Sequence, residues 1–138
     1  TTGTTVTIAA TSNGTTNMVK CAATTTLNTM SDFDNGGANN GRLRYTGKTP
    51  RAFHIACTIS VSPVTSNDQF VFGVAANGGV FGSSKIIQKM GLTTDAQSTA
   101  MHVMITLYPG DYLELYVGNM TAGRNVVVKS INLFALGM

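Results

Sequence analysis

One stretch, residues 107–119, constrains the fold more than any other part of this sequence. A Pro109-Gly110-Asp111 turn separates two apolar runs. Proline fixes φ and glycine tolerates positive φ, so the chain can reverse its direction there. After the turn, apolar residues alternate with polar or aromatic ones: Leu113, Leu115 and Val117 against Tyr112, Glu114 and Tyr116. Successive side chains of a strand point to opposite faces, which predicts a strand with one core face and one face carrying two large rings.

Residues 51–61 form the most regular alternating run. Apolar residues occupy one face (Phe53, Ile55, Cys57, Ile59 and Val61), and small or weakly polar residues occupy the other (Ala52, His54, Ala56, Thr58 and Ser60). A solvated strand usually carries charges on its outer face, so this face predicts the close approach of another surface. Further strands are expected at 69–76, 100–107 and 126–136, separated by turn signals such as Asn77-Gly78-Gly79. The last run is apolar almost throughout and should lie centrally in a sheet. The pattern predicts an all-β, two-sheet antiparallel jelly-roll sandwich.

The composition indicates that much of the surface is covered. Hydrophobic residues make up 43% of the 138 residues and charged residues only 11%, against a usual charged fraction of about 25%. We expect a folded β chain whose surface is partly covered by copies of itself. The length suits one domain, with residues 1–30 a Thr-rich strand or linker segment and residues 31–138 the jelly-roll domain. The missing initiator Met predicts an excised or processed chain.

Three segments together carry a resemblance to a known family. Residues 41–45 with Gly47 and residues 51–55 resemble the opening strands of C1q/TNF-like domains. Residues 107–115 resemble the family's penultimate "leucine, then Gly-Asp, then apolar strand" signature, and residues 128–136 resemble its closing strand. The resemblance spans residues 32–138. It implies a ten-stranded jelly roll that trimerises and forms the head of a trimeric stalk, in secreted animal proteins or at the tips of phage and viral fibres, spikes and tail needles.

The resemblance also implies an interface. In the family, an inner sheet faces the three-fold axis, and here it would contain the strands at 51–61 and 111–117 together with the last strand. The axis-facing residues would be His54, Ala56, Thr58, Tyr112, Glu114, Tyr116 and Phe134, which gives the two tyrosine rings a location. At the axis, three Glu114 carboxylates would need a cation or a basic neighbour. Alternatively, Glu114 lies at the sheet end, in water or paired with Arg42 or Arg44.

The chain departs from the secreted animal members in lacking a Gly-X-Y repeat and any tryptophan. Its Thr-, Asn- and Gly-rich loops are similar to those of a phage or viral fibre tip. The sequence therefore predicts a homotrimeric virion-surface module that attaches to a host cell-surface receptor, with a glycan among the candidates. Two alternatives stay open: a secreted C1q-like adhesin with an extracellular location, and a monomeric glycan-binding or calcium-binding lectin-like sandwich.

The groups that an enzyme site needs are scarce. His54 and His102 are the only imidazoles, and the six acidic residues include a single Glu. No Gly-x-Ser-x-Gly or similar nucleophile motif accompanies them, and two His with two Cys at these spacings do not form a zinc pattern. We predict no enzymatic activity and no cofactor. His54 could sense pH at an axis, although a hydrogen-bonded or solvated histidine is the commoner case.

Other partner classes are also disfavoured. Asp32, Asp34 and Asn35 faintly resemble a calcium loop, but no Glu closes it at the required offset, so the segment 30–40 is predicted to be loop without metal. Basic residues are scattered except for the polar rim Arg42, Arg44, Lys48 and Arg51, which argues against nucleic acid. No apolar run approaches the roughly 20 residues of a membrane helix. Cys57, and with it Cys21, is expected as a free thiol, Cys57 being buried.

Overall fold

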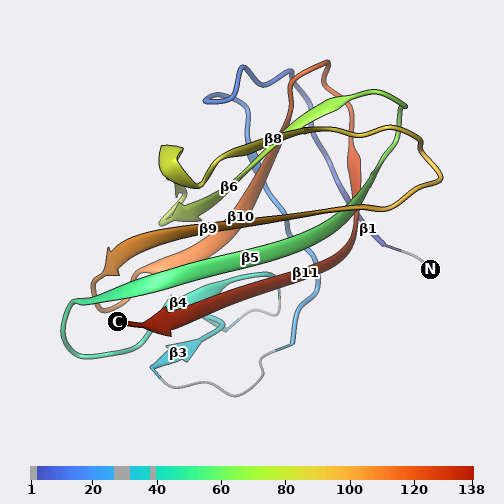
Figure 1. Cartoon of the computed structure of the whole chain (residues 1–138). Helices are drawn as coiled ribbons and strands as arrows, with labels where there is room; N and C mark the ends of the chain where they lie inside the picture. Colours follow the sequence, from blue (N-terminus) through green and yellow to red (C-terminus); the bar gives the residue numbers. More distant parts are fainter. Residues whose placement is uncertain (1–2, 27–31, 38–39) are drawn as a thin grey trace.

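The computed structural model describes residues 3–26, 32–37 and 40–138, and it forms two antiparallel β-sheets packed face to face (Figure 1). A four-stranded sheet has the order β1-β11-β5-β9, and a seven-stranded sheet has the order β3-β4-β10-β6-β7, with β2 paired to β10 and β8 to β6. The strands are β1 Thr4–Val6, β2 Val19–Lys20, β3 Phe33–Asp34, β4 Leu43–Tyr45, β5 Arg51–Pro63, β6 Gln69–Ala76, β7 Gly79–Val80, β8 Ile86–Lys89, β9 Gln97–Leu107, β10 Tyr112–Asn119 and β11 Val126–Gly137. The predicted all-β, two-sheet jelly-roll fold is confirmed.

The alternating runs form the expected strands. In β5, Phe53, Ile55, Cys57, Ile59 and Val61 are all buried, and in β10 Leu113, Leu115 and Val117 are buried. Strand β11 lies between β1 and β5 only at Val126–Val128; from Ser130 to Gly137 it pairs with β5 alone among the described residues, so the last run is central in its sheet only at its start. One short helical turn, η1 (Gly82–Ser84), is the helical element of the described residues, and none of their helices is long and apolar enough to span a membrane.

The turn before β10 is held by side chains as well as by its sequence. Gly110 has a φ of 91°. The carboxylate of Asp111 accepts hydrogen bonds from the backbone N–H of Tyr108 at 2.9 Å and from Nδ2 of Asn77 at 2.9 Å. Asn77 and Gly78, which join β6 to β7, also have positive φ values, as the Asn-Gly signal predicts. Two neighbouring turns are thereby fixed to each other.

The N-terminal segment contributes to both sheets. Strand β1 pairs with β11 through Val126–Val128, and β2 pairs with β10. Val6, Ile8, Cys21 and Ala23 are buried in the common core. The predicted boundary at residue 30 falls in 27–31, outside the described residues, while residues 3–26 pack into the sandwich. The expectation of loop throughout 30–40 is wrong at Phe33–Asp34, which pair with β4 as β3.

Strand β10 does not belong to the sheet that contains β5 and β11. It pairs with β4 and β2 along one edge and with β6 along the other. The expectation that residues 111–117 share an inner sheet with β5 and β11 is therefore wrong. Alternation tells which side chains of a strand face the core, but it is the same in either layer of a sandwich. The sequence pattern could not assign the strand to its sheet.

Candidate functional site

The side chains that β5, β9 and β11 place on the outer side of the four-stranded sheet, as described next, are uncharged. We call this surface the open face; its residues are Ala52, His54, Ala56, Thr58 and Ser60 of β5, Ser98, Ala100, His102, Met104 and Thr106 of β9, and Ser130, Asn132, Phe134 and Leu136 of β11. Met104, Phe134 and Leu136 are large apolar side chains that are 56%, 46% and 54% exposed. An exposed apolar surface without charges is typical of an interaction surface.

Strand register places the open-face residues in rows. Leu136, His54 and Met104 form one row across β11, β5 and β9, and the next row contains Phe134, Ala56 and His102. The third row contains Asn132, Thr58 and Ala100. Four of the seven predicted interface residues, namely His54, Ala56, Thr58 and Phe134, therefore lie together on one surface.

The other three predicted residues, Tyr112, Glu114 and Tyr116, lie on the outer side of the opposite sheet. Their cover comes from the same chain. Glu114 is only 3% exposed, and its carboxylate lies 2.5 Å from Nζ of Lys20 and 3.2 Å from Nε of Arg42. The ion pair with Arg42 was one of the alternatives that the sequence left open, whereas Lys20 was not anticipated. Arg44 instead pairs with Asp34.

The two tyrosine rings are half-buried within the chain. The guanidinium of Arg42 lies 4.1 Å from the centroid of the Tyr112 ring, a cation–π contact. Partial burial raises the pKa of Tyr116, with smaller contributions from Glu114 and Tyr112 and an opposing one from Arg42. The rings thus do not require a partner subunit to cover them. The predicted interface residues divide between two opposite surfaces of the chain, four on the open face and three on the outer side of the other sheet.

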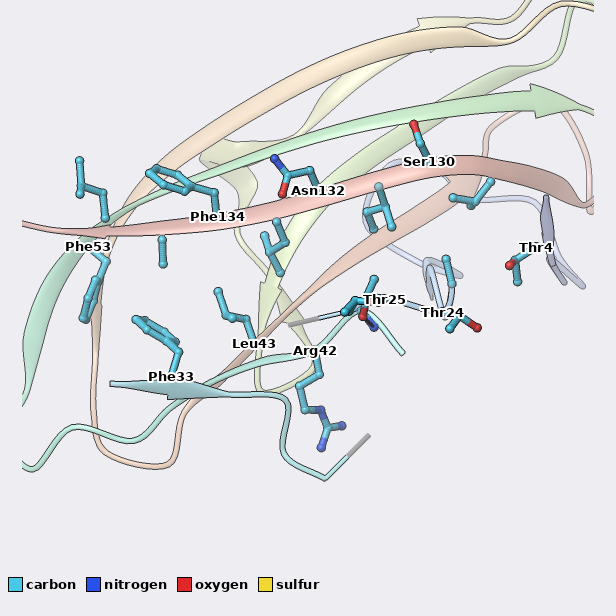
Figure 2. A pocket seen from close by; sticks show the side chains of 18 of the residues that line it. Thr4, Thr24, Thr25, Phe33, Arg42, Leu43, Phe53, Ser130, Asn132 and Phe134 are labelled. Carbon is cyan, nitrogen blue, oxygen red and sulfur yellow. Dashed lines mark hydrogen bonds between the residues drawn. The ribbon is translucent and has the colours of Figure 1, made fainter. Parts of the chain in front are cut away.

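A cleft of about 930 Å³ runs between β11 and the strands β3 and β4, as Figure 2 shows. Phe33, Leu43 and Phe53 form its apolar wall, and Thr24 and Thr25 lie at the other end. Strand β11 pairs with β1 only through Val126–Val128, and the inward-pointing Ile131, Leu133 and Ala135 are only half-buried. The alternation of β11 resembles that of a fully covered strand, so the sequence contained no signal for this cleft.

An ion pair whose carboxylate is buried was also missed. The Asp68 side chain is 1% exposed and accepts hydrogen bonds from Nε of Arg124 and Nδ2 of Asn119, both at 2.9 Å. Arg124 holds the pKa of Asp68 below its usual range, burial opposes this, and Asn119 adds to the lowering. The cluster joins the start of β6 to the end of β10 and the loop that follows. A carboxylate in a polar loop gives no sequence sign that it is buried.

The cysteines and the segment that faintly resembles a calcium loop have simple surroundings. Cys57 is buried as predicted, Cys21 is buried as well, and both are free thiols. Burial raises the pKa of Cys57 to about 12 and raises that of Cys21 further. Asp34 accepts hydrogen bonds from Arg44 and from the N–H of Gly36. Within the described ranges, no three His, Cys, Asp or Glu side chains are grouped so that they could hold a metal ion.

Comparisons with known proteins bear on the fold. No protein-family model and no curated protein matches the chain. Murine APRIL at pH 5.0 is similar over 88% of this chain and 92% of its own, with 11% identity and a TM-score of 0.56. The C-terminal domain of EclA, a sugar-binding protein, matches over 97% and 79% with 14% identity and a TM-score of 0.47. The PRD1 vertex protein P5 matches over 97% and 93% with 14% identity and a TM-score of 0.46. The likeness to APRIL supports a TNF-like jelly-roll fold.

Proposed function

We propose that this chain is a non-enzymatic homotrimeric module of a virion surface, the head of a fibre, spike or tail needle, which attaches to a host cell-surface receptor. The open face is the observation that carries the proposal. It combines exposed Met104, Phe134 and Leu136 with small uncharged neighbours, so a second subunit can approach it without desolvating a carboxylate or an ammonium group. The trimer contact is assigned to this face, with His54, Ala56, Thr58 and Phe134 in it.

The placement in a virion depends on the sequence resemblance to trimeric fibre heads and on the Thr-, Asn- and Gly-rich loops. A three-fold assembly buries one surface of each subunit against a different surface of the next, and rotation closes the ring. The loops at the ends of the sandwich then stay accessible to a receptor. Tyr108, 59% exposed in the turn before β10, is one such position.

Replacing Phe134 by Lys is expected to dissociate the trimer. The substitution puts an ammonium group onto the open face, where subunit contact would desolvate it. Sedimentation velocity at micromolar concentration should report a trimer for the unaltered chain and a monomer for Phe134→Lys. Ile87→Lys is the matched control because Ile87 is similarly exposed, at 52%, but lies on β8 in the other sheet; it should remain trimeric. A folded, monomeric unaltered chain would contradict the proposal.

The cleft favours one alternative, a monomeric glycan-binding sandwich. Its wall combines an aromatic ring, Phe33, with the side chains of Thr24 and Thr25, and rings of this kind stack on the apolar faces of sugars. A glycan array read together with sedimentation separates the two functions. Glycan hits by a monomer, lost in Phe33→Ala, would favour the alternative. A trimer that competes with virions for adsorption to host cells would favour the attachment module.

A further inference from the structure

We infer that His54 and His102 form a two-imidazole site for a first-row transition-metal cation, with the thioether of Met104 beside it. These are the only histidines of the chain, and they are 48 positions apart in sequence. Pairing of β5 with β9 brings them onto the same face, in neighbouring rows. Their ring centroids are 5.4 Å apart, and the rings are inclined by 65°. Both ligands come from one chain, so a single subunit can form the site; because the proposed trimer contact contains His54, binding is tested on a monomeric variant as well as on the unaltered chain.

The distance between the two imidazole rings suits the binding of one cation by both. Imidazole nitrogens bind zinc and similar ions at about 2.1 Å, which places the centroids of two rings on one ion roughly 5 Å apart. Rotation of a ring about χ2 is the adjustment that would bring one nitrogen of each imidazole to the same ion. That torsion has broad minima, so the adjustment is cheap. The two strands are already held together by the ladder from Arg51–Leu107 to Val61–Gln97, which preorganises the two ligands.

The surroundings leave the rings accessible. A shallow hollow of about 340 Å³ is lined by both histidines and by the small side chains Ala56, Thr58 and Ala100. His102 is exposed and His54 is half-buried. The open face contains no lysine or arginine in the rows around them, so no fixed cation repels an incoming ion. Cys57 also borders the hollow, but its side chain is buried on the core side.

Met104 determines which cations the site prefers. It pairs directly with His54 across β5 and β9 and is 56% exposed. Directly opposite residues have Cβ atoms about 5 Å apart, within reach of a flexible thioether. Imidazole suits copper, nickel and zinc, whereas a thioether suits Cu⁺. Among divalent ions, Cu²⁺ should bind most tightly, with water completing its coordination.

Calorimetric titration with Cu²⁺ in a non-coordinating buffer at neutral pH tests the site. We expect one ion per chain and nitrogen hyperfine splitting from two imidazoles in the Cu²⁺ electron paramagnetic resonance spectrum. His54→Gln and His102→Gln should each weaken binding by roughly tenfold or more, because either change removes the chelate. The double variant should also lose the weak binding that a single imidazole still gives. Unchanged affinity in the single variants, or two independent weak sites, would overturn the inference.

Two further variants separate this inference from the trimer. Phe134→Lys, expected to be monomeric, should still bind one Cu²⁺ per chain because Phe134 is not a ligand, but with lower affinity, since its ammonium group lies in the same row as His102. If neither this variant nor the unaltered chain binds Cu²⁺, the metal site is wrong whatever sedimentation reports. Met104→Leu should weaken Cu⁺ binding in a competition assay and leave Ni²⁺ binding unchanged; equal Cu⁺ affinity would remove Met104 from the site.

Discussion

Replacing Asp68 by Ala is expected to lower the free energy of unfolding at neutral pH by about 3 kcal/mol. The carboxylate is 1% exposed and is held by Arg124 and Asn119. Its removal leaves a fully buried Asn119 amide without its carboxylate partner and takes away the ionic link between two loops. Urea denaturation at equilibrium measures the change. A loss below about 1 kcal/mol would contradict the structural role of this pair.

The effect should depend on pH with a definite sign. Because the folded-state pKa of Asp68 is below its ordinary value of 3.8, its contribution to stability is fully present above that value. The contribution is lost as the pH falls through the folded-state pKa. The stability curves of the unaltered chain and Asp68→Ala should therefore be far apart at neutral pH and converge below about pH 4. Curves that stay parallel down to acid pH would contradict the assignment.

Asp34→Ala is the matched control for Asp68→Ala. Asp34 also pairs with an arginine, Arg44, but their side chains are 38% and 43% exposed. Exposed ion pairs contribute little because water already solvates both charges. The control should therefore unfold at nearly the same urea concentration as the unaltered chain, which separates burial of the carboxylate from mere loss of an ion pair.

Replacing Phe53 by Ala is expected to destabilise the fold by about 4 kcal/mol. The ring of Phe53 is 2% exposed and lies 5.1 Å, centroid to centroid, from both Phe33 and Tyr45. Phe53 belongs to β5, whereas Phe33 and Tyr45 belong to β3 and β4, so this trio joins the two sheets. Its removal leaves a cavity at the inner wall of the cleft, where neighbouring side chains cannot all move in.

Equilibrium unfolding in urea is again the measurement for Phe53→Ala. Ile87→Ala serves as the control, since Ile87 is a large apolar residue on an exposed strand position and should change the free energy of unfolding by less than about 0.5 kcal/mol. If Phe53→Ala were as mild as Ile87→Ala, the aromatic trio would not be what holds β3 and β4 against β5.

Local patterns predicted the parts of the fold that local chemistry determines. Alternation in residues 51–61 specified both faces of β5, and the Pro-Gly-Asp turn specified the entry into β10. Positive φ at Asn77 and Gly78 likewise follows from the residue types. The outer face of β5 lacks charges, and four predicted interface residues lie on it; contact of this face with another subunit stays a prediction.

The rest depends on pairings between residues that are distant in sequence. Residues 112–119 contain no sequence signal that β6 is their neighbour in the sheet. For this reason β10 was assigned to the wrong sheet. Arg42 covers the ring of Tyr112, and Lys20 is one ion-pair partner of Glu114. Both Arg42 and Lys20 lie far upstream of β10 in the sequence. Only the folded chain brings His54 and His102 together. A pattern read along one strand contains no information about which strand lies beside it.

The two buried thiols allow the opening of the sandwich to be measured. Cys21 follows β2 on one layer and Cys57 belongs to β5 on the other, and only the thiolate form of a cysteine attacks an alkylating reagent. With both groups buried and held protonated, modification has to wait for the layers to separate. The rate at which iodoacetamide labels each cysteine in the native protein therefore records how often its own layer opens, without any introduced probe.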